Sequence, residues 1–248
     1  MVTTVTTVST APGSPGSPLW DPTAVPAATV IVVRDAAAGV EVLMLKRDSK
    51  LSFAGGHWVF PGGRIDPADR AAPDGSEDGD LEAAARRAAV REAAEEAGLV
   101  IVPDSLLRWS HWTPPPESPK RYSTAFFVAP LTDAEAVVRI DDSEIRDHRW
   151  ARPADVITMR DDGEVELSPP TFITLVQLGG PPTVADLMIE AESRVVEHFA
   201  TRIAAVEDTM VALYHGDVAY EGDDPSNDGP RHRLWLESNW RYERTTLP

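Results

Sequence analysis

Apolar and β-branched residues fall into short runs along the first half of the chain, and polar turns separate these runs. Residues 27–34 (AATVIVVR) and 40–46 (VEVLMLK) are the first two runs, and the turn between them predicts a hairpin. Further strands are predicted at residues 57–60, 106–112, 122–129, 148–151, 202–206 and 233–236. This pattern indicates a sheet assembled from short strands.

Helical patterns stand between and after these strands. The clearest covers residues 81–97, which are rich in alanine, with Asp78 or Asp80 as N-cap and Gly98 at the position that ends a helix. Further helices are predicted at residues 153–159, 169–178 and 184–200. Residues 66–80 contain six acidic residues, two prolines and two glycines, and we predict a solvated loop there.

The order of these elements predicts one α/β domain with a mixed sheet. We expect this core at residues 27–165. Residues 1–26 are rich in Pro, Thr and Ser, which predicts a disordered tail. Residues 166–248 are predicted to form a C-terminal extension of helices and strands that packs on the core.

Composition narrows the classes of protein. The chain has 248 residues, of which 42% are hydrophobic and none is cysteine. A wholly disordered chain, a disulfide scaffold and a cysteine nucleophile are therefore excluded. No apolar run approaches the roughly 20 residues of a membrane helix. The first ten residues also lack the segments of a secretory signal, so we expect a cytoplasmic protein with no membrane partner.

The net charge of −17 restricts the classes of partner that the protein is expected to bind. Such a surface repels the phosphate backbone of DNA or RNA, so no nucleic-acid partner is expected. An anionic small-molecule substrate is compatible with this charge where bound cations or a local basic patch hold its phosphates.

Three carboxylates share one face of the predicted helix 81–97. Glu92, Glu95 and Glu96 lie within an arc of roughly 100°, at the helix end where the dipole disfavours anions. A bound cation would relieve this repulsion, and oxygen ligands suit Mg²⁺ or Mn²⁺. The alternative is a solvated helix face, because Glu and Ala are good helix formers. The opposite arc carries Ala83, Val90, Ala94 and Ala97, and we expect it to pack on the sheet.

A glycine turn precedes this helix and adds a second motif. The strand ending at Phe60 runs into Pro61-Gly62-Gly63 and then Arg64-Ile65-Asp66, where the glycines let the backbone approach a ligand closely.

Together the two motifs resemble the box of the Nudix hydrolase family, which runs Gly, five residues, Glu, seven residues, then Arg-Glu-U-x-Glu-Glu-x-Gly-U, with U aliphatic. Its second half matches residues 91–99 and its first half begins at Gly63. Arg91 follows Gly63 by 28 positions, twice the family spacing, so an acidic insertion splits the box. Counted back from Arg91, the intermediate Glu falls at Ala83, and the adjacent Glu82 is its candidate replacement.

The resemblance implies a Nudix-type α/β/α sandwich and a metal-dependent hydrolase of nucleoside diphosphate derivatives. It implies that Mg²⁺ or Mn²⁺ is held by Glu92, Glu95 and Glu96, with the Gly62 carbonyl as a further ligand. Arg91 is expected to orient the helix carboxylates and the loop. The general base is one of the helix acids or Glu144, an acid in a later loop. The resemblance also allows a homodimer.

Residues 43–63 resemble the motif that precedes the box in CoA-cleaving members of this family. Arg47, Gly56 and residues 60–63 are in register, whereas Asp48 stands in place of Ser and Ser52 in place of a second Arg. Lys50 is a candidate to supply the missing cation. The resemblance implies cleavage of CoA or acyl-CoA to 3′,5′-ADP and (acyl-)phosphopantetheine.

The candidate substrate-binding residues are Arg47, Lys50, Gly63, Arg64 and Arg121. Two alternatives stay open. One is the same chemistry on ADP-ribose, a nucleotide sugar or a dinucleotide. The other is a non-catalytic module that binds a nucleotide and reports it to a partner.

Overall fold

The computed structural model describes residues 19–51, 54–71, 80–133, 136–140, 143–222 and 224–245. Most of the predicted tail, residues 1–18, lies outside the described residues. The core elements are β1 (Val25–Ala36), β2 (Gly39–Arg47), β3 (Trp58–Val59), β4 (Gly62–Arg64), the 3₁₀ turn η1 (Pro67–Arg70), α1 (Leu81–Ala97), the 3₁₀ turn η2 (Pro103–Ser105), β5 (Leu107–Thr113), β6 (Tyr122–Pro130), β7 (Ile145–Ala151) and α2 (Pro153–Asp161). The C-terminal elements are α3 (Pro169–Leu178), α4 (Val184–Ser193), β8 (Glu197–Ala200), β9 (Arg202–Val206), β10 (Thr209–Leu213), β11 (His232–Trp235) and β12 (Arg241–Arg244).

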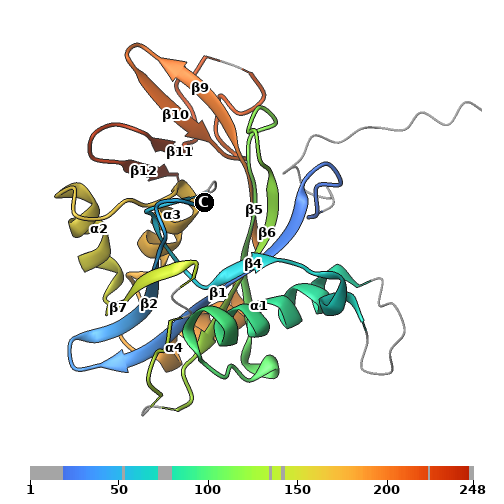
Figure 1. The fold of residues 1–248 in the computed structure, drawn as a ribbon. Helices are drawn as coiled ribbons and strands as arrows, with labels where there is room; N and C mark the ends of the chain where they lie inside the picture. Colours follow the sequence, from blue (N-terminus) through green and yellow to red (C-terminus); the bar gives the residue numbers. More distant parts are fainter. Residues whose placement is uncertain are drawn as a thin grey trace, which may run out of the picture.

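An eight-stranded mixed sheet organises the molecule (Figure 1). Its strands follow the order β3-β2-β1-β6-β5-β8, with β4 paired to β1 and β7 paired to β2. β1 and β6 are parallel, whereas β1 and β2 form the predicted antiparallel hairpin. The mixed α/β fold is therefore confirmed.

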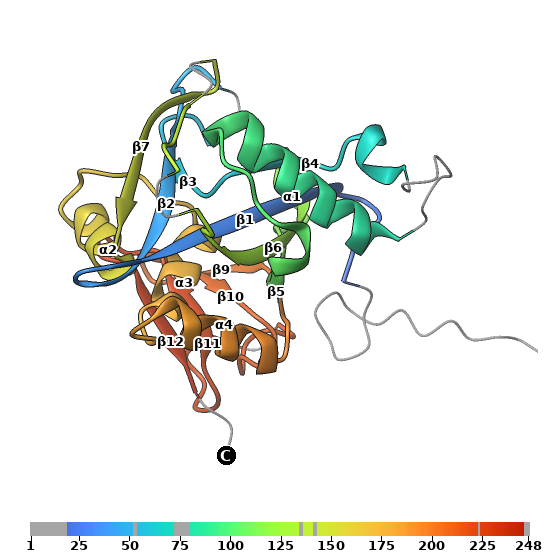
Figure 2. The same ribbon diagram turned by 90° about the horizontal axis from the view of Figure 1, so that it is seen from below.

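The long strand β1 contributes side chains to two hydrophobic cores, because successive side chains point to opposite faces of the sheet. Val30 and Val32 point to the side covered by α1, where they pack with its alanines. Ile31 and Val33 point to the other side, where they join the core formed with α3, α4 and part of the second sheet. Figure 2 shows α1 on one side of β1 and the C-terminal elements on the other.

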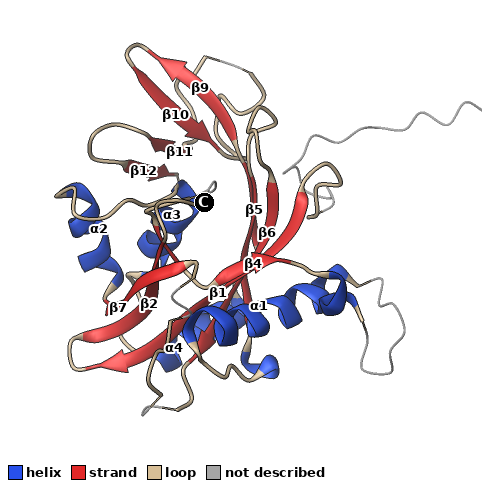
Figure 3. Cartoon of the chain, viewed as in Figure 1, coloured by secondary structure: helices blue, strands red, loops and turns tan. Residues whose placement is uncertain are grey.

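A second sheet of four strands, in the order β12-β11-β10-β9, belongs to the C-terminal extension. Figure 3 shows it as a separate group of strands beside the helices α2 and α3. Of its strands, β9 and β11 are close to the predicted ones, whereas β10 and β12 were not predicted. Among the described residues, every helix is too short or too polar to cross a lipid bilayer.

Helix α1 begins and ends where the sequence predicts. The Asp80 side chain accepts a hydrogen bond of 2.9 Å from the backbone N–H of Glu82, and Gly98 adopts φ of 66° just after the last turn. The bounds of α3 are also confirmed.

The predicted helix 184–200 is wrong beyond Ser193. There α4 ends, and residues 197–200 form β8, which pairs in parallel with β5. Two consecutive β-branched residues, Val195 and Val196, precede this strand and disfavour a helix. Pairing with β5 provides hydrogen bonds for backbone groups that a continued helix would have paired within itself.

The predicted solvated loop 66–80 also contains structure. Residues 67–70 form η1, in which Asp69 is buried; residues 72–79 lie outside the described residues. At the N-terminal end, the predicted boundary at residue 26 falls inside β1. The described residues before it also make contacts: the rings of Trp20 and His111 lie edge to face at 4.7 Å.

Candidate active site

The C-terminal half of α1 meets the glycine turn that leads into β4. Glu96 Oε2 accepts a hydrogen bond of 2.9 Å from the backbone N–H of Gly62. The Glu92 carboxylate lies directly against Gly63, because a Cβ placed on that residue would be 2.2 Å from Glu92 Oε1. Glu95 points outward, with 58% of its side chain exposed. Two of the three predicted carboxylates therefore contact the turn, and the third lies at its solvent side.

Arg91 connects the helix carboxylates to the loop after β4. Its Nη1 donates hydrogen bonds of 2.8 Å to Glu92 Oε1 and 2.8 Å to Glu95 Oε2. Its Nη2 donates to the backbone carbonyl of Arg64 at 3.0 Å and to Asp69 Oδ2 at 2.9 Å. The pKa of Arg91 lies above its ordinary value, chiefly because of the bond to Asp69. This position is compatible with the orienting role that the sequence predicts.

Asp69 is a site residue that the sequence reasoning missed. It is 5% exposed, and its Oδ1 also accepts from Arg91 Nε at 3.2 Å. Asp69 follows Gly63 by six positions, where a forward count from the first half of the family box places its acid. The count back from Arg91 ends inside α1, whereas the insertion separates Asp69 from that helix, so the backward count pointed to other residues.

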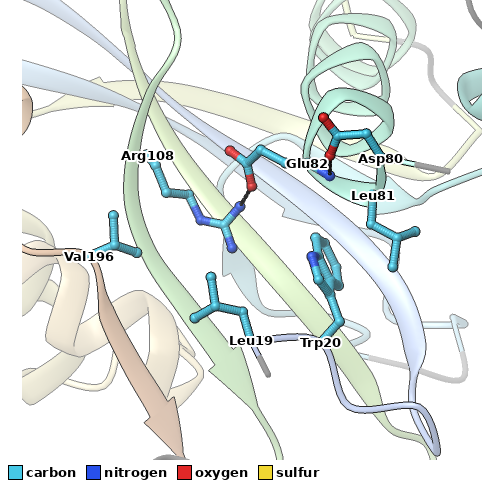
Figure 4. A pocket seen from close by; sticks show the side chains of 7 residues that line it. All are labelled: Leu19, Trp20, Asp80, Leu81, Glu82, Arg108 and Val196. Carbon is cyan, nitrogen blue, oxygen red and sulfur yellow. Dashed lines mark hydrogen bonds and ion pairs between the residues drawn. The ribbon is translucent and has the colours of Figure 1, made fainter. Parts of the chain in front are cut away.

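Glu82, the residue suggested by that count, lies elsewhere. It forms an ion pair with Arg108 beside a hollow of about 540 Å³ near the start of α1, lined also by Trp20 and Leu81 (Figure 4). Glu82 lies in the first turn of α1, so most of the length of the helix separates it from the glutamates near the other end.

Burial and mutual repulsion raise the pKa values of Glu92 and Glu96. Burial raises the pKa of Glu96 to about 8, and the neighbouring Glu92 and Glu144 carboxylates add to this rise. The N–H of Gly62 and the charge of Arg47 act in the opposite direction. Burial likewise raises the pKa of Glu92, against the effect of Arg91. A cation at this place would stabilise the ionised carboxylates.

Arg47 and Glu144 come to the same site from other elements. Arg47, at the end of β2, places its Nη1 3.8 Å from Glu96 Oε1 and its Nη2 3.0 Å from Glu144 Oε2. Glu144 precedes β7, and its backbone carbonyl accepts from the N–H of Asp48 at 2.7 Å. Pairing of β2 with β7 brings these distant segments together.

The remaining predicted residues lie at different places. Arg64 stands in β4 with 67% of its side chain exposed, 3.7 Å from Asp66. Lys50 lines a hollow beside Arg47. Arg121 lies apart, at the start of β6, where its Nη2 is 2.6 Å from Asp21 Oδ2. The structure does not bring Arg121 together with the glutamates.

The oxygen ligands offered here match a hard divalent cation in their chemistry. Glu92 and Glu96, both carboxylates, flank the turn that carries the Gly62 carbonyl. Within the described ranges, no three acidic or histidine side chains converge as a ready metal-binding group. Arg91 binds Glu92 and Glu95 instead, so these carboxylates would turn from Arg91 to hold an ion.

The structure brings together the two halves of the box described above, the glycine turn and the helix rich in glutamates, on one mixed sheet. A NUDIX domain model matches residues 24–171, more than half of the chain. The chain belongs to the Nudix family of hydrolases, pyrophosphohydrolases that act on phosphorus anhydrides.

Several known proteins are similar to this chain over part of its length. It is 27% identical to nudix hydrolase 7 of Caenorhabditis elegans, over 55% of each protein, so it spans about half the length of that relative. It is 24% identical to acyl-coenzyme A diphosphatase NUDT19 of Xenopus laevis, over 78% of this chain and 74% of that protein. The Gallus gallus protein of the same name is 28% identical, over 52% of this chain and 36% of its own length. The crystal structure of a NUDIX hydrolase from Alicyclobacillus acidocaldarius superposes with a TM-score of 0.58 at 26% identity, covering 67% of this chain and 96% of that one.

Proposed function

We propose that this enzyme cleaves the diphosphate bond of CoA or acyl-CoA in the presence of Mg²⁺ or Mn²⁺, releasing 3′,5′-ADP and (acyl-)phosphopantetheine. One observation carries the proposal: the carboxylates of half-buried Glu92 and buried Glu96 lie against the glycine turn, and Arg47 joins them to a cationic hollow. The printed names of the Xenopus and Gallus relatives, acyl-coenzyme A diphosphatases, support the choice of substrate.

The residues of the chain divide the work of the reaction. Glu92, Glu95 and Glu96 would hold the cation, and Arg91, fixed by Asp69, keeps the helix carboxylates and the turn in place. A divalent cation bound there would supply charge neutralisation for the diphosphate and would lower the pKa of an attacking water. A carboxylate would accept the proton of that water. The candidates are a helix glutamate and Glu144, which Arg47 holds beside the site.

A substrate panel tests this function. CoA, an acyl-CoA, ADP-ribose and NADH are incubated with Mg²⁺ and with Mn²⁺, and the products are separated and identified by mass. Release of phosphopantetheine from CoA supports the proposal. Preferential release of a sugar phosphate from ADP-ribose contradicts the substrate and keeps the chemistry. The absence of metal-dependent cleavage of every compound contradicts the site itself.

A further inference from the structure

A hollow of about 550 Å³ lies between the end of β2 and the start of β7, next to the glutamate site. Four cations line it, Lys46, Arg47, Lys50 and Arg146, with two carboxylates, Asp48 and Asp147. This excess of positive charge stands in a chain of net charge −17. Such a local reversal of sign attracts an anion where the rest of the surface repels it.

A buried carboxylate fixes the arrangement of this hollow. Arg146 donates to Asp48 Oδ2 from Nε at 2.8 Å and from Nη2 at 2.5 Å. The other oxygen of Asp48 accepts from the backbone N–H of Lys50 at 2.9 Å. That N–H, and then Arg146, hold the pKa of Asp48 below its ordinary value, so the carboxylate stays ionised. The guanidinium is thereby oriented before any ligand binds, which lowers the entropy lost on binding.

The two lysines add charge that is not neutralised by ion pairs. Lys46 and Lys50 are exposed, and no acid among the described residues forms an ion pair with either of them. A phosphate monoester would find here an oriented guanidinium and two mobile ammonium groups.

Arg47 joins this hollow to the glutamates. Its guanidinium lies 3.8 Å from Glu96 and 3.0 Å from Glu144, while the same side chain lines the hollow. A molecule whose diphosphate lies at the glutamates can therefore place a second charged group in the hollow.

We propose that the hollow binds a phosphate monoester of the substrate that is not cleaved, and that Arg146 and Lys50 make the enzyme prefer substrates that carry it. The inference rests on the proposed function, because in CoA this group is the 3′-phosphate on the ribose that also carries the diphosphate. In this sequence Ser52 replaces the second Arg of the CoA motif, and Arg146 brings a cation to the hollow from β7.

The test compares CoA with dephospho-CoA, which lacks only the 3′-phosphate. The measured quantity is kcat/KM for CoA divided by kcat/KM for dephospho-CoA. It is determined for the wild type, Arg146→Gln and Lys50→Gln. Arg152→Gln is the matched control, since Arg152 also pairs with an aspartate, at 2.7 Å from Asp155, and is similarly exposed. We expect the ratio to fall about tenfold in Arg146→Gln, several-fold in Lys50→Gln and not in the control. Lys50→Gln leaves the Arg146–Asp48 pair intact, so it separates charge from loop structure.

A ratio that is equal in the wild type and Arg146→Gln overturns the inference while the proposed function stands. If CoA is not cleaved at all, the proposed function fails and a binding experiment decides the inference. Calorimetry then compares 3′,5′-ADP with AMP. Tighter binding of 3′,5′-ADP that Arg146→Gln abolishes supports the hollow, and equal binding of both nucleotides overturns it.

Discussion

The two glycines of the turn after Phe60 meet different neighbours, and this difference separates stability from activity. A Cβ on Gly62 would lie 2.6 Å from the backbone carbonyl oxygen of Ala28 and 2.9 Å from the Cα of Thr29. A Cβ on Gly63 would instead meet the end of the Glu92 side chain, which can move. Backbone atoms in a sheet cannot yield in this way, because neighbouring strands hold them.

We therefore predict that Gly62→Ala lowers the free energy of unfolding by about 1–3 kcal/mol. Gly63→Ala should leave stability nearly unchanged and lower kcat by about tenfold or more, because it displaces the Glu92 carboxylate. Urea unfolding and steady-state kinetics measure the two effects. The same loss of activity without loss of stability in both variants would contradict the geometry of the turn.

A substitution at Glu95 tests the carboxylate face of α1 without disturbing the fold. The Glu95 side chain is 58% exposed, so Glu95→Gln removes one charge and no buried contact. We expect a loss of kcat of about a hundredfold or more with Mg²⁺, at an unchanged melting temperature. The control is Glu192→Gln, on the exposed face of α4. Activity close to that of the wild type in Glu95→Gln would count against the metal assignment.

Asp69 positions Arg91 and is expected to act through it. Asp69→Asn keeps the shape of the side chain but removes the charge that fixes the guanidinium, so we expect kcat to fall by about 10- to 100-fold, with KM little changed. Asp69→Glu should restore part of the activity. An Asp69→Asn variant with normal kcat would show that the bond has a structural role alone.

At the scale of elements, α1 shows that the buried face of an alanine-rich helix is hard to predict from its sequence. Its capping residues fixed its ends, but the arc predicted to face the sheet is only partly buried. Ala97 is fully buried, Ala83 and Val90 are half-buried, and Ala94 is exposed. The buried stripe includes Ala93 and also Glu96. Small alanines on every side give no apolar contrast around the helix, so packing against β1 and the turn decides which face is buried.

The second sheet contains a buried ion pair that holds β11 to the turn after β10. Arg233 donates to Asp217 from Nε at 2.7 Å and from Nη2 at 2.6 Å, and both side chains are at most 1% exposed. The bonds donated by Arg233 and by the N–H groups of His232 and Ala219 outweigh burial and lower the pKa of Asp217.

Breaking this pair should therefore be costly. We predict that Asp217→Leu lowers the free energy of unfolding by about 3–5 kcal/mol, because it leaves Arg233 buried without a counter-charge. The double variant Asp217→Leu/Arg233→Met should recover most of this loss. Calorimetric melting measures both. A single variant as stable as the wild type would contradict the burial of the pair.

At the scale of the whole molecule, buried histidines link folding to pH. Burial lowers the pKa of His111 to about 2 and that of His198 to about 4, and the charge of Arg108 contributes to both shifts. Asp21 opposes the shift of His198. Below about pH 6.5 the unfolded chain binds protons that the folded chain does not, so the free energy of unfolding falls as pH falls.

We predict that a histidine kept neutral in the fold costs up to about 1.4 kcal/mol of stability per pH unit below its ordinary pKa. His198→Gln should make the loss between pH 7 and pH 5 smaller than in the wild type. Urea unfolding of the metal-free protein at both pH values measures it, with the exposed His148→Gln as control. An equal slope in wild type and His198→Gln would refute the link.

The sequence by itself determined the local elements and the position of the glutamates along the helix. Capping residues fixed α1, alternating runs fixed the hairpin of β1 and β2, and the split box identified the glutamates. These features depend on residues close together in the chain, so spacing reveals them.

Only the tertiary structure decided which distant residues meet. Strand pairing made β8 from residues predicted to be helical, brought Arg146 to Asp48 across β2 and β7, and left Arg121 with Asp21, away from the glutamates. The loop after β4 folded Asp69 back onto Arg91 across the insertion. Such contacts depend on the path of the chain in space, which local spacing does not encode.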